Sequence, residues 1–255
     1  MKIFCFKLRS TMQMLSLSLI AIALAFVVAF TNAGTVYFGY AYRLVPIYSV
    51  DTNEKKVALT FDAAWGSDKT SKIIELLKNE GVDATFFLVG FWVESNEDKV
   101  KEIFNAGFDI GTHSNTHPKM STLSKEQIKK ELEISSKLIS DITGARVTLF
   151  RPPFGDYNDN LIKVAGDLGL KTIQWDVDRL DWKGLSAEEI LTRVKSSVKN
   201  GSIILFHNNS DHILKAIPLV ISYLKTQGYS MVKLSHLVYD NNYVIDNNGL
   251  QKQNN

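Results

Sequence analysis

Cysteine and net charge are both nearly absent from this chain of 255 residues. Cys5 is the only cysteine, which excludes an intrachain disulfide and a zinc site built on cysteines. Lysine and arginine number 29 against 27 acidic residues, which leaves a formal charge of +2 at pH 7. Nucleic-acid binding needs a basic surface, so we expect no nucleic-acid partner. Hydrophobic residues make up 45% of the chain and charged residues 22%, as in a globular protein.

Charged residues are also missing from a long stretch near the N-terminus. None occurs between Arg9 and Arg43, and residues 12–30 form a dense apolar run. A helix over this run is about long enough to cross a bilayer, and three basic residues precede it. We therefore expect a transmembrane helix in the cell membrane, with the N-terminus in the cytoplasm and the rest of the chain outside. The alternative is a signal sequence cleaved near Thr31–Ala33, which would release the protein.

The composition divides the chain into four predicted parts. Residues 1–33 form the cytoplasmic tip and the membrane anchor or signal sequence, and residues 34–53 form a stem. Residues 54–238 form the functional domain. Residues 239–255 are rich in asparagine and poor in core residues, so we expect a mobile polar tail.

Within residues 54–238, short apolar runs alternate with amphipathic runs. The predicted strands are 57–62, 84–90, 109–112, 147–151, 172–177, 202–207 and 230–234. The predicted helices are 68–79, 97–106, 125–143, 158–168, 187–199 and 211–226. Strand followed by helix, repeated about every 25–35 residues, indicates an α/β fold with a parallel sheet. With this many repeats, a deformed (β/α) barrel is favoured over an open doubly wound sheet.

Polar residues recur where these predicted strands end. They are Asp62, His113, Arg151, Asp178 and His207. In parallel α/β folds, reactive groups lie beyond the carboxyl ends of the strands. Five such residues on five strands are expected to converge on one cleft.

His113 and His117 are two imidazoles four residues apart. Pro118 disfavours helical geometry at His117, so the pair is expected on an irregular turn after a strand. Two close histidines without basic neighbours suit a divalent metal, with zinc as the default. The alternative is one exposed histidine and one that is hydrogen-bonded for structural reasons.

The remaining strand-end residues suggest acid–base chemistry. Asp62 follows an apolar strand, where desolvation raises a carboxyl pKa toward that of a usable base. Arg151, held by two prolines, can orient a carboxylate and keep it ionised. Asp178 could pair with His207 and make it an imidazolium acid. Helix capping, loop tying and core packing are the structural alternatives for these residues.

Together the motifs resemble the polysaccharide deacetylase family, the NodB-homology domain of carbohydrate esterase family four. Five ordered motifs carry the resemblance: Thr60–Asp62 (TFD), His113–His117 (HSNTH), Arg151–Gly155 (RPPFG), Asp178–Trp182 (DRLDW) and Leu205–His207 (LFH). It spans about residues 54–237. Residues 61–66 (FDAAWG) and 175–178 (WDVD) are similar to the sporulation-associated, PdaB-like branch.

The resemblance implies a hydrolase that removes acetyl groups from N-acetylglucosamine or N-acetylmuramic acid in cell-wall glycan, with a divalent metal. It also implies a role for each matching residue: His113 and His117 as metal ligands, Asp62 as general base, Arg151 as its orienting partner, His207 as general acid supported by Asp178, the Phe154 N–H as oxyanion donor, and Leu205 and Trp182 as the lining of the acetyl pocket. A metal-bound water of lowered pKa, a base and an acid suit the hydrolysis of an amide.

One position departs from the family pattern. The family has two consecutive aspartates, the second of which completes an Asp-His-His metal site, and here Ala63 stands in its place. Losing a charged ligand weakens metal binding. The sequence therefore predicts a weak or specialised deacetylase, with a glycan-binding pseudoenzyme as the alternative. A metal hydrolase acting on another amide or ester is a further possibility.

Overall fold

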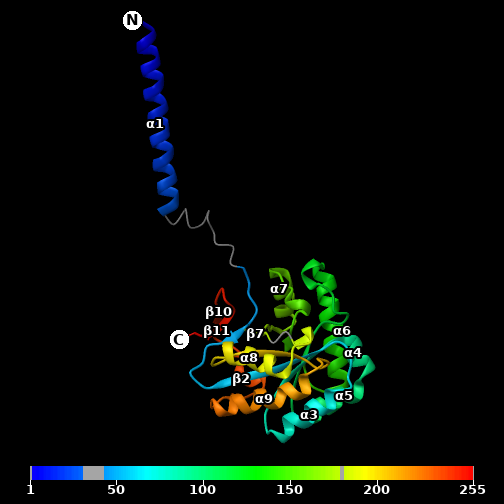
Figure 1. Cartoon of the computed structure of the whole chain (residues 1–255). Coiled ribbons are helices and arrows are strands. Elements are labelled where there is room, and N and C mark those ends of the chain that lie inside the picture. The colour runs from blue at the N-terminus through cyan, green and yellow to red at the C-terminus, as the bar shows by residue number, and fades with distance from the viewer. Residues whose placement is uncertain (1, 31–42, 179–180, 255) are drawn as a thin grey trace. The chain divides into compact units, whose positions relative to one another are not determined.

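The computed structural model describes residues 2–30, 43–178 and 181–254, which belong to two compact units, Met1–Arg43 and Leu44–Asn255 (Figure 1). In the first unit, residues Lys2–Phe30 form the helix α1. Within the described part of the chain, no helix combines the length and apolar character that a membrane crossing requires. The transmembrane helix predicted over residues 12–30 is therefore not found. Residues 34–42 of the predicted stem lie outside the described residues.

The second unit is built on a curled parallel sheet with strand order β6-β5-β4-β3-β2-β8-β7, and β9 pairs with β2. The strands are β2 (Lys56–Ala63), β3 (Thr85–Leu88), β4 (Asp109–Thr112), β5 (Leu149–Phe150), β6 (Lys171–Thr172), β7 (Val177–Asp178), β8 (Ile203–His207) and β9 (Ser230–Met231). Among the described residues, the outer strands β6 and β7 do not pair with each other, so the barrel stays open. This confirms the predicted deformed barrel.

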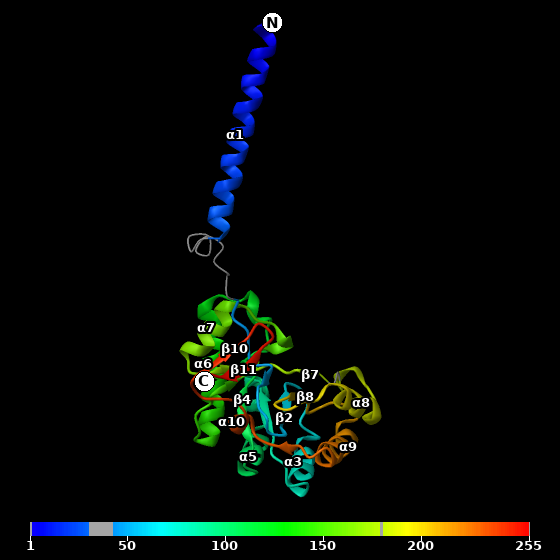
Figure 2. The same cartoon turned by 90° about the vertical axis from the view of Figure 1, so that its left-hand side faces the viewer.

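Helices cover the outside of the sheet (Figures 1 and 2). They are α3 (Thr70–Asn79), α4 (Gly90–Ser95), α5 (Glu97–Asn105), α6 (Lys125–Thr143), α7 (Asp159–Asp167), α8 (Ala187–Ser197), α9 (Ile213–Thr226) and α10 (Leu234–Leu237). Short 3-10 helices follow at Met120–Thr122, Pro153–Gly155 and Asp181–Lys183. The six longer helices were predicted within a few residues, whereas the short helices α4 and α10 were not predicted.

The main core lies between the sheet and its helices. Every residue of β2 from Val57 to Ala63 is buried, as expected for a central parallel strand covered on both faces. The Phe61 ring stacks on Phe86 and Phe206, with ring centroids 5.0 and 5.5 Å apart. Such pairs add about 0.5–1.5 kcal/mol each beyond the burial of their area. This packing fixes the position of β2, which carries Asp62.

A second, three-stranded sheet forms from residues that were predicted to be the stem and the mobile tail. It has the order β1-β11-β10, formed by β1 (Ser49–Val50), β11 (Leu250–Gln253) and β10 (Tyr243–Ile245). Residues 239–255 were predicted to be a mobile tail, but their strands pair with β1 from the predicted stem. The Gln251 side chain is wholly buried, and its amide exchanges hydrogen bonds with both backbone groups of Tyr239. Both ends of the second unit are thus built into the domain.

Candidate active site

Asp62 and His207 lie side by side at the carboxyl edge of the sheet. They are register partners on the neighbouring parallel strands β2 and β8, and side chains paired in this way point to the same face. The loops after β4 and β5 bring His113 and Arg151 to the same place. The Asp62 Oδ2 lies 3.6 Å from the His113 Nε2, and Asp62 Oδ1 lies 2.8 Å from the Arg151 Nη1. Four of the five predicted strand-end residues, Asp62, His113, Arg151 and His207, therefore do meet.

Arg151 is fully buried and holds Asp62 in place. Its Nη1 donates to the Asp62 carboxylate and, at 2.9 Å, to the Thr60 hydroxyl, while its Nη2 donates to the Gln174 carbonyl at 3.1 Å. The guanidinium also lies 4.2 Å from the centre of the Phe87 ring. A buried charge is tolerated when it is paired and hydrogen-bonded, and Arg151 meets both conditions.

This contact reverses the predicted pKa shift of Asp62. Burial acts to raise the pKa of the carboxyl, but electrostatic interactions, above all that with the Arg151 charge, and the hydrogen bond from Arg151 lower it further than burial raises it. The net direction is down, whereas the sequence predicted a rise. Asp62 is therefore ionised at neutral pH and is a weaker base than predicted.

The histidine pair lies on an irregular turn, as its sequence suggested. The rings of His113 and His117 meet edge to face with centroids 5.0 Å apart. The His113 Nδ1 lies 2.7 Å from the Arg151 carbonyl oxygen. A carbonyl can only accept, so Nδ1 carries the proton and Nε2 of the neutral ring keeps its lone pair. Burial lowers the pKa of His113. Burial also lowers the pKa of His117 to about 4, and the electrostatic interaction with His113 acts in the same direction.

Glu131 on α6 fixes this turn, a role that no motif in the sequence indicated. Its carboxylate accepts the backbone N–H groups of Asn115 and Thr116, each at 2.8 Å, and the Thr116 hydroxyl at 2.7 Å. Ser114 and His117 have positive φ values of 69° and 57°, an uncommon conformation for residues other than glycine. Glu131 therefore stabilises a strained backbone that positions the imidazole pair.

The residues present do not fit a metal site with three protein ligands. The family resemblance puts the third ligand at position 63, where Ala63 offers only a buried methyl group. Across the described parts of the chain, no group of three or more histidine, cysteine or acidic side chains could hold a metal ion. The Asp62 carboxylate lies 3.6 Å from His113, but it is held by Arg151. His113 and His117 alone supply two nitrogen donors.

The hydrogen-bond partner of His207 is Asp181, not the predicted Asp178. Asp181 is buried, and its Oδ1 lies 2.7 Å from the His207 Nδ1 while its Oδ2 accepts the His207 backbone N–H at 2.8 Å. Burial lowers the pKa of His207, but the hydrogen bond and charge of Asp181 outweigh it, with smaller contributions from Asp62 and Asp178, and the pKa rises. Asp178 ends β7, in register with Leu205. The imidazolium form of His207 is thus favoured, but through Asp181.

Large aromatic side chains from three loops surround this site. Phe154 and Trp182, both predicted as substrate-binding positions, are 63% and 60% exposed, and Trp65, which was not predicted, is 57% exposed. Phe154 has a positive φ of 61°, within the short helix Pro153–Gly155, which begins at the second of two consecutive prolines. Leu205, predicted to line the acetyl pocket, is buried in β8.

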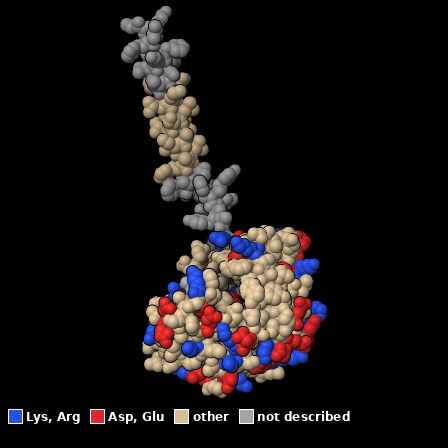
Figure 3. Space-filling model, turned by 45° about the vertical axis from the view of Figure 1, so that its right-hand side comes forward, with Lys and Arg blue, Asp and Glu red and all other residues tan. Residues whose placement is uncertain are grey.

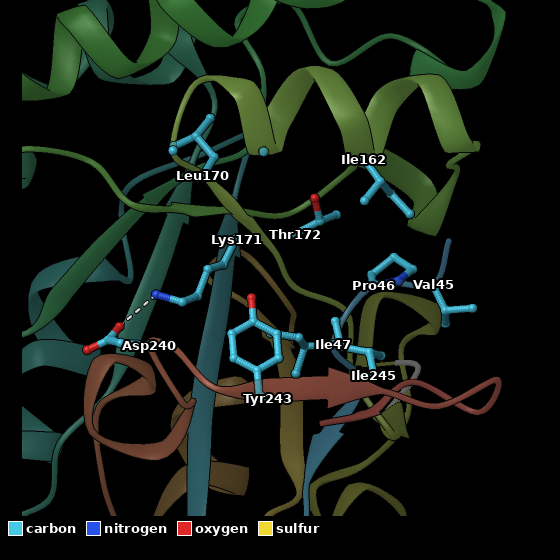
Figure 4. Close-up of a pocket in the computed structure, with 12 residues that line it drawn as sticks. Val45, Pro46, Ile47, Ile162, Leu170, Lys171, Thr172, Asp240, Tyr243 and Ile245 are labelled. Carbon is cyan, nitrogen blue, oxygen red and sulfur yellow. Dashed lines mark hydrogen bonds and ion pairs between the residues drawn. The ribbon is translucent and has the colours of Figure 1, made fainter. Parts of the chain in front are cut away.

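A pocket of about 320 Å³ lies away from these residues, among α7, β6, β10 and residues 45–47 (Figure 4). The ion pair of Lys171 and Asp240, at 2.7 Å, lies at its side. None of the predicted site residues lines it.

Acidic and basic side chains are interspersed on the face of the second unit seen in Figure 3.

The fold and this site are of the polysaccharide deacetylase type. The model of the family described as "Polysaccharide deacetylase" matches residues 49–173. A peptidoglycan-N-acetylglucosamine deacetylase of Bacillus cereus is 33% identical over 196 residues, which cover 75% of this chain and 92% of that protein. The chain therefore belongs to the polysaccharide deacetylase family, as its motifs indicated. This is a family of hydrolases.

The chain is also similar to a protein of Bacillus subtilis and to two solved structures of one pseudoenzyme. The uncharacterised protein YlxY of Bacillus subtilis is 33% identical, over 76% of this chain and 60% of that protein's length. A solved structure, described as a wild-type CE4 family pseudoenzyme from Bacillus anthracis, is 38% identical with a TM-score of 0.74, and the match covers 76% of this chain and 68% of that one. A mutant of that pseudoenzyme, described as having restored enzymatic activity, is 40% identical with a TM-score of 0.73 and covers 76% and 71%.

Proposed function

We propose that this protein is an N-deacetylase-like hydrolase that acts weakly on N-acetylated amino sugars of cell-wall glycan. The observation that carries the proposal is the pairing of Asp62 with Arg151 and of His207 with Asp181 on adjacent strands. One pair keeps a carboxylate ionised and the other keeps an imidazole protonated, so a base and an acid face the same space. The deacetylase relative from Bacillus cereus supports peptidoglycan as the substrate class.

The two pairs supply the proton transfers of amide hydrolysis. Asp62 accepts a proton from the water whose oxygen bonds to the acetyl carbon. His207 donates a proton to the nitrogen as the carbon–nitrogen bond breaks, which yields acetate and a free amine. The lowered pKa of Asp62 makes it a weak base. Among the described residues, the histidine pair does not complete a three-ligand metal site, so these two steps depend on the side chains of Asp62 and His207.

A glycan-binding pseudoenzyme is the second candidate. Ala63 removes the third metal ligand of the family pattern, and the similar structure from Bacillus anthracis is described as a pseudoenzyme. In this case the exposed aromatic side chains would bind glycan, while the acid–base pairs would have no catalytic use. Both candidates predict glycan binding, and they differ in acetate release.

Acetate release and glycan binding measured on the same purified protein separate the two candidates. We expect slow release from N-acetylglucosamine oligomers and from peptidoglycan, with loss of release in Asp62→Asn and His207→Ala. The zinc content of each sample is measured in parallel. If the wild type binds oligomers but releases no acetate with any added divalent metal, the pseudoenzyme is correct. If it neither binds nor releases, both candidates fail.

Ala63→Asp provides a second test. The substitution returns a carboxylate to the position where the family pattern has its third ligand, so zinc affinity is expected to rise together with acetate release. Strong activity created from none would identify the natural protein as one that has lost catalysis. A rise in zinc affinity without any activity would show that the metal ligand is not the only missing part.

We also propose that the domain acts outside the cytoplasm, in spore-forming cells. Basic residues precede an uncharged stretch near the N-terminus, and the proposed substrate is a wall polymer. The resemblance of residues 61–66 and 175–178 supports the sporulation role. Protease treatment of intact cells tests the location, and fractionation distinguishes membrane-attached from released protein. Expression confined to vegetative growth would contradict the sporulation role.

A further inference from the structure

Trp65 is a large exposed side chain on a rigid loop beside the site. It follows β2 and is 57% exposed. The next residue, Gly66, adopts a positive φ of 66°, and its carbonyl accepts hydrogen bonds from the Trp92 indole at 2.7 Å and from the Asn208 amide at 2.8 Å. Trp92 and Asn208 are both buried. The loop is therefore fixed to the core, and it holds the indole at the surface.

The Trp65 ring contacts the histidine pair of the candidate active site. Its centroid lies 4.9 Å from that of His117 at an angle of 71°, and the Phe154 ring lies 4.6 Å from the same imidazole, also at 71°. The three rings come from the loops that follow β2, β4 and β5. Two exposed aromatic rings thus contact one imidazole, and together they extend the site across the surface.

We propose that Trp65 forms a glycan subsite by stacking on a pyranose ring next to the sugar whose acetamide lies at Asp62 and His207. The proposal rests on the proposed function, since it assumes an N-acetylated glycan in the site. An exposed indole leaves apolar area in water, and such area beside a site marks a binding surface. The apolar C–H face of a neutral sugar matches an indole face, which interacts through its π-electrons.

The position of Trp65 favours a neighbouring sugar over the reacting one. Its contact is with His117, while the acid–base pairs are formed by Asp62 and His207 on the strands themselves. A chain that reaches from the acid–base pairs past His117 would lay its next ring against Trp65. The indole therefore contributes to affinity for oligomers and not to affinity for a single sugar.

Calorimetric titration of the full-length protein with the β-1,4-linked tetramer of N-acetylglucosamine tests this subsite. Trp65→Ala is expected to weaken tetramer binding by about fivefold or more, and Trp65→Phe, which keeps an aromatic face, by about twofold or less. Binding of the single sugar, followed by NMR, should not change in either variant. Phe104→Ala is the matched control: Phe104 is 40% exposed but lies near the end of α5, which leads to the opposite edge of the sheet.

Each outcome decides the proposal. Tetramer affinity that is unchanged in Trp65→Ala overturns the subsite while leaving the proposed function intact. An equal loss for the single sugar also overturns it, because Trp65 would then contact the reacting sugar. A wild-type protein that binds no tetramer removes the proposed function and the subsite together. An equal loss in Phe104→Ala would show that the effect does not belong to this surface.

Discussion

Arg151 shows how a charge at 0% exposure is kept in this fold. Its guanidinium is paired with Asp62, hydrogen-bonded to Thr60 and the Gln174 carbonyl, and stacked over Phe87. Removing one partner of a buried pair leaves the other charge uncompensated, which costs far more than the pair itself contributes. The pair is therefore better tested by changing both residues than by changing one.

We expect Arg151→Met to destabilise the protein by about 3–5 kcal/mol at pH 7, because the Asp62 carboxylate then lies buried without a partner. The double variant Arg151→Met, Asp62→Asn should recover much of this loss. Urea unfolding measures the free energy of unfolding of the single and the double variant. Lys101→Ala is the control, since it breaks an exposed ion pair with Glu97 and should cost less than about 0.5 kcal/mol. A double variant as unstable as the single one would contradict the argument.

His207 gives a prediction about pH. The pKa of His207 is raised above its ordinary value of 6.5, mainly through Asp181. Asp181→Asn should lower that pKa, and Asp178→Asn should lower it less. A raised pKa in the folded state contributes stability that is fully present below the unfolded pKa and is lost as pH rises through the folded pKa. The stability difference between wild type and Asp181→Asn should therefore narrow as pH rises.

NMR titration of the His207 ring in the three proteins measures these shifts directly. Asp178→Asn serves as the matched control, because it removes a carboxylate from the same motif without removing the 2.7 Å hydrogen bond. A larger shift in Asp178→Asn than in Asp181→Asn would show that the original prediction from the sequence had the correct partner.

At the scale of elements, α6 connects helix capping to the histidine turn. Ser124 forms a capping box with Gln127 at the start of the helix, and Gly144 ends it in a left-handed conformation. Two turns into the helix, Glu131 reaches the backbone of residues 115 and 116. The helix thus acts as the support on which the strained turn of His117 depends.

Glu131→Ala should loosen this turn, because it removes three hydrogen bonds that no other helix residue replaces in kind. Amide hydrogen exchange at Asn115 and Thr116 should become at least about tenfold faster, which corresponds to about 1.4 kcal/mol of lost local stability. Glu131→Gln keeps an acceptor oxygen, so the amide exchange at these residues should accelerate less than in Glu131→Ala. Glu133→Ala on the same helix breaks only an exposed pair with Lys129 and serves as the control. Equal exchange in all four proteins would contradict the role of Glu131.

Elements with local signals were predictable from the sequence. The bounds of α6 were predicted at 125–143, where the structure has them, because its cap and its terminal glycine lie within the segment. The run 172–177 was predicted as one strand, but it leaves the sheet after Thr172. Ile173 bridges to Ile47, and the Gln174 carbonyl accepts from Arg151. Those partners are distant in the sequence, so the interruption could not be seen locally.

The candidate site was predictable as a set of strand ends but not as a set of contacts. The parallel fold brings Asp62, His113, Arg151 and His207 together because each follows or ends a strand. The choice between Asp178 and Asp181 depends on the path of the chain within one motif. The pKa direction of Asp62 depends on a 2.8 Å contact with Arg151. Spacing in the sequence determines neither of these.

At the scale of the whole second unit, the three-stranded sheet β1-β11-β10 is connected to the candidate active site through the core. Ile47 and Val50, around β1, pack in one buried cluster with Phe87, and Ile245 of β10 packs against this cluster. Phe87 in turn lies under the guanidinium of Arg151. The C-terminal strands are thus linked through the core to the residue that holds Asp62, although their composition predicted a mobile tail.

Removal of residues 240–255 should therefore destabilise the domain and not merely shorten it. The truncation takes away Gln251, whose carbonyl accepts the Asp51 N–H at 2.8 Å, and it exposes the cluster around Val50. We expect the melting temperature to fall by about 10 °C, which for a domain of this size corresponds to a few kcal/mol. Removal of residues 254–255 alone is the control, because it leaves β11 complete. Thermal unfolding of the three proteins decides the point: if the longer truncation melts with the wild type, the second sheet contributes no stability and the link to Arg151 through Phe87 is wrong.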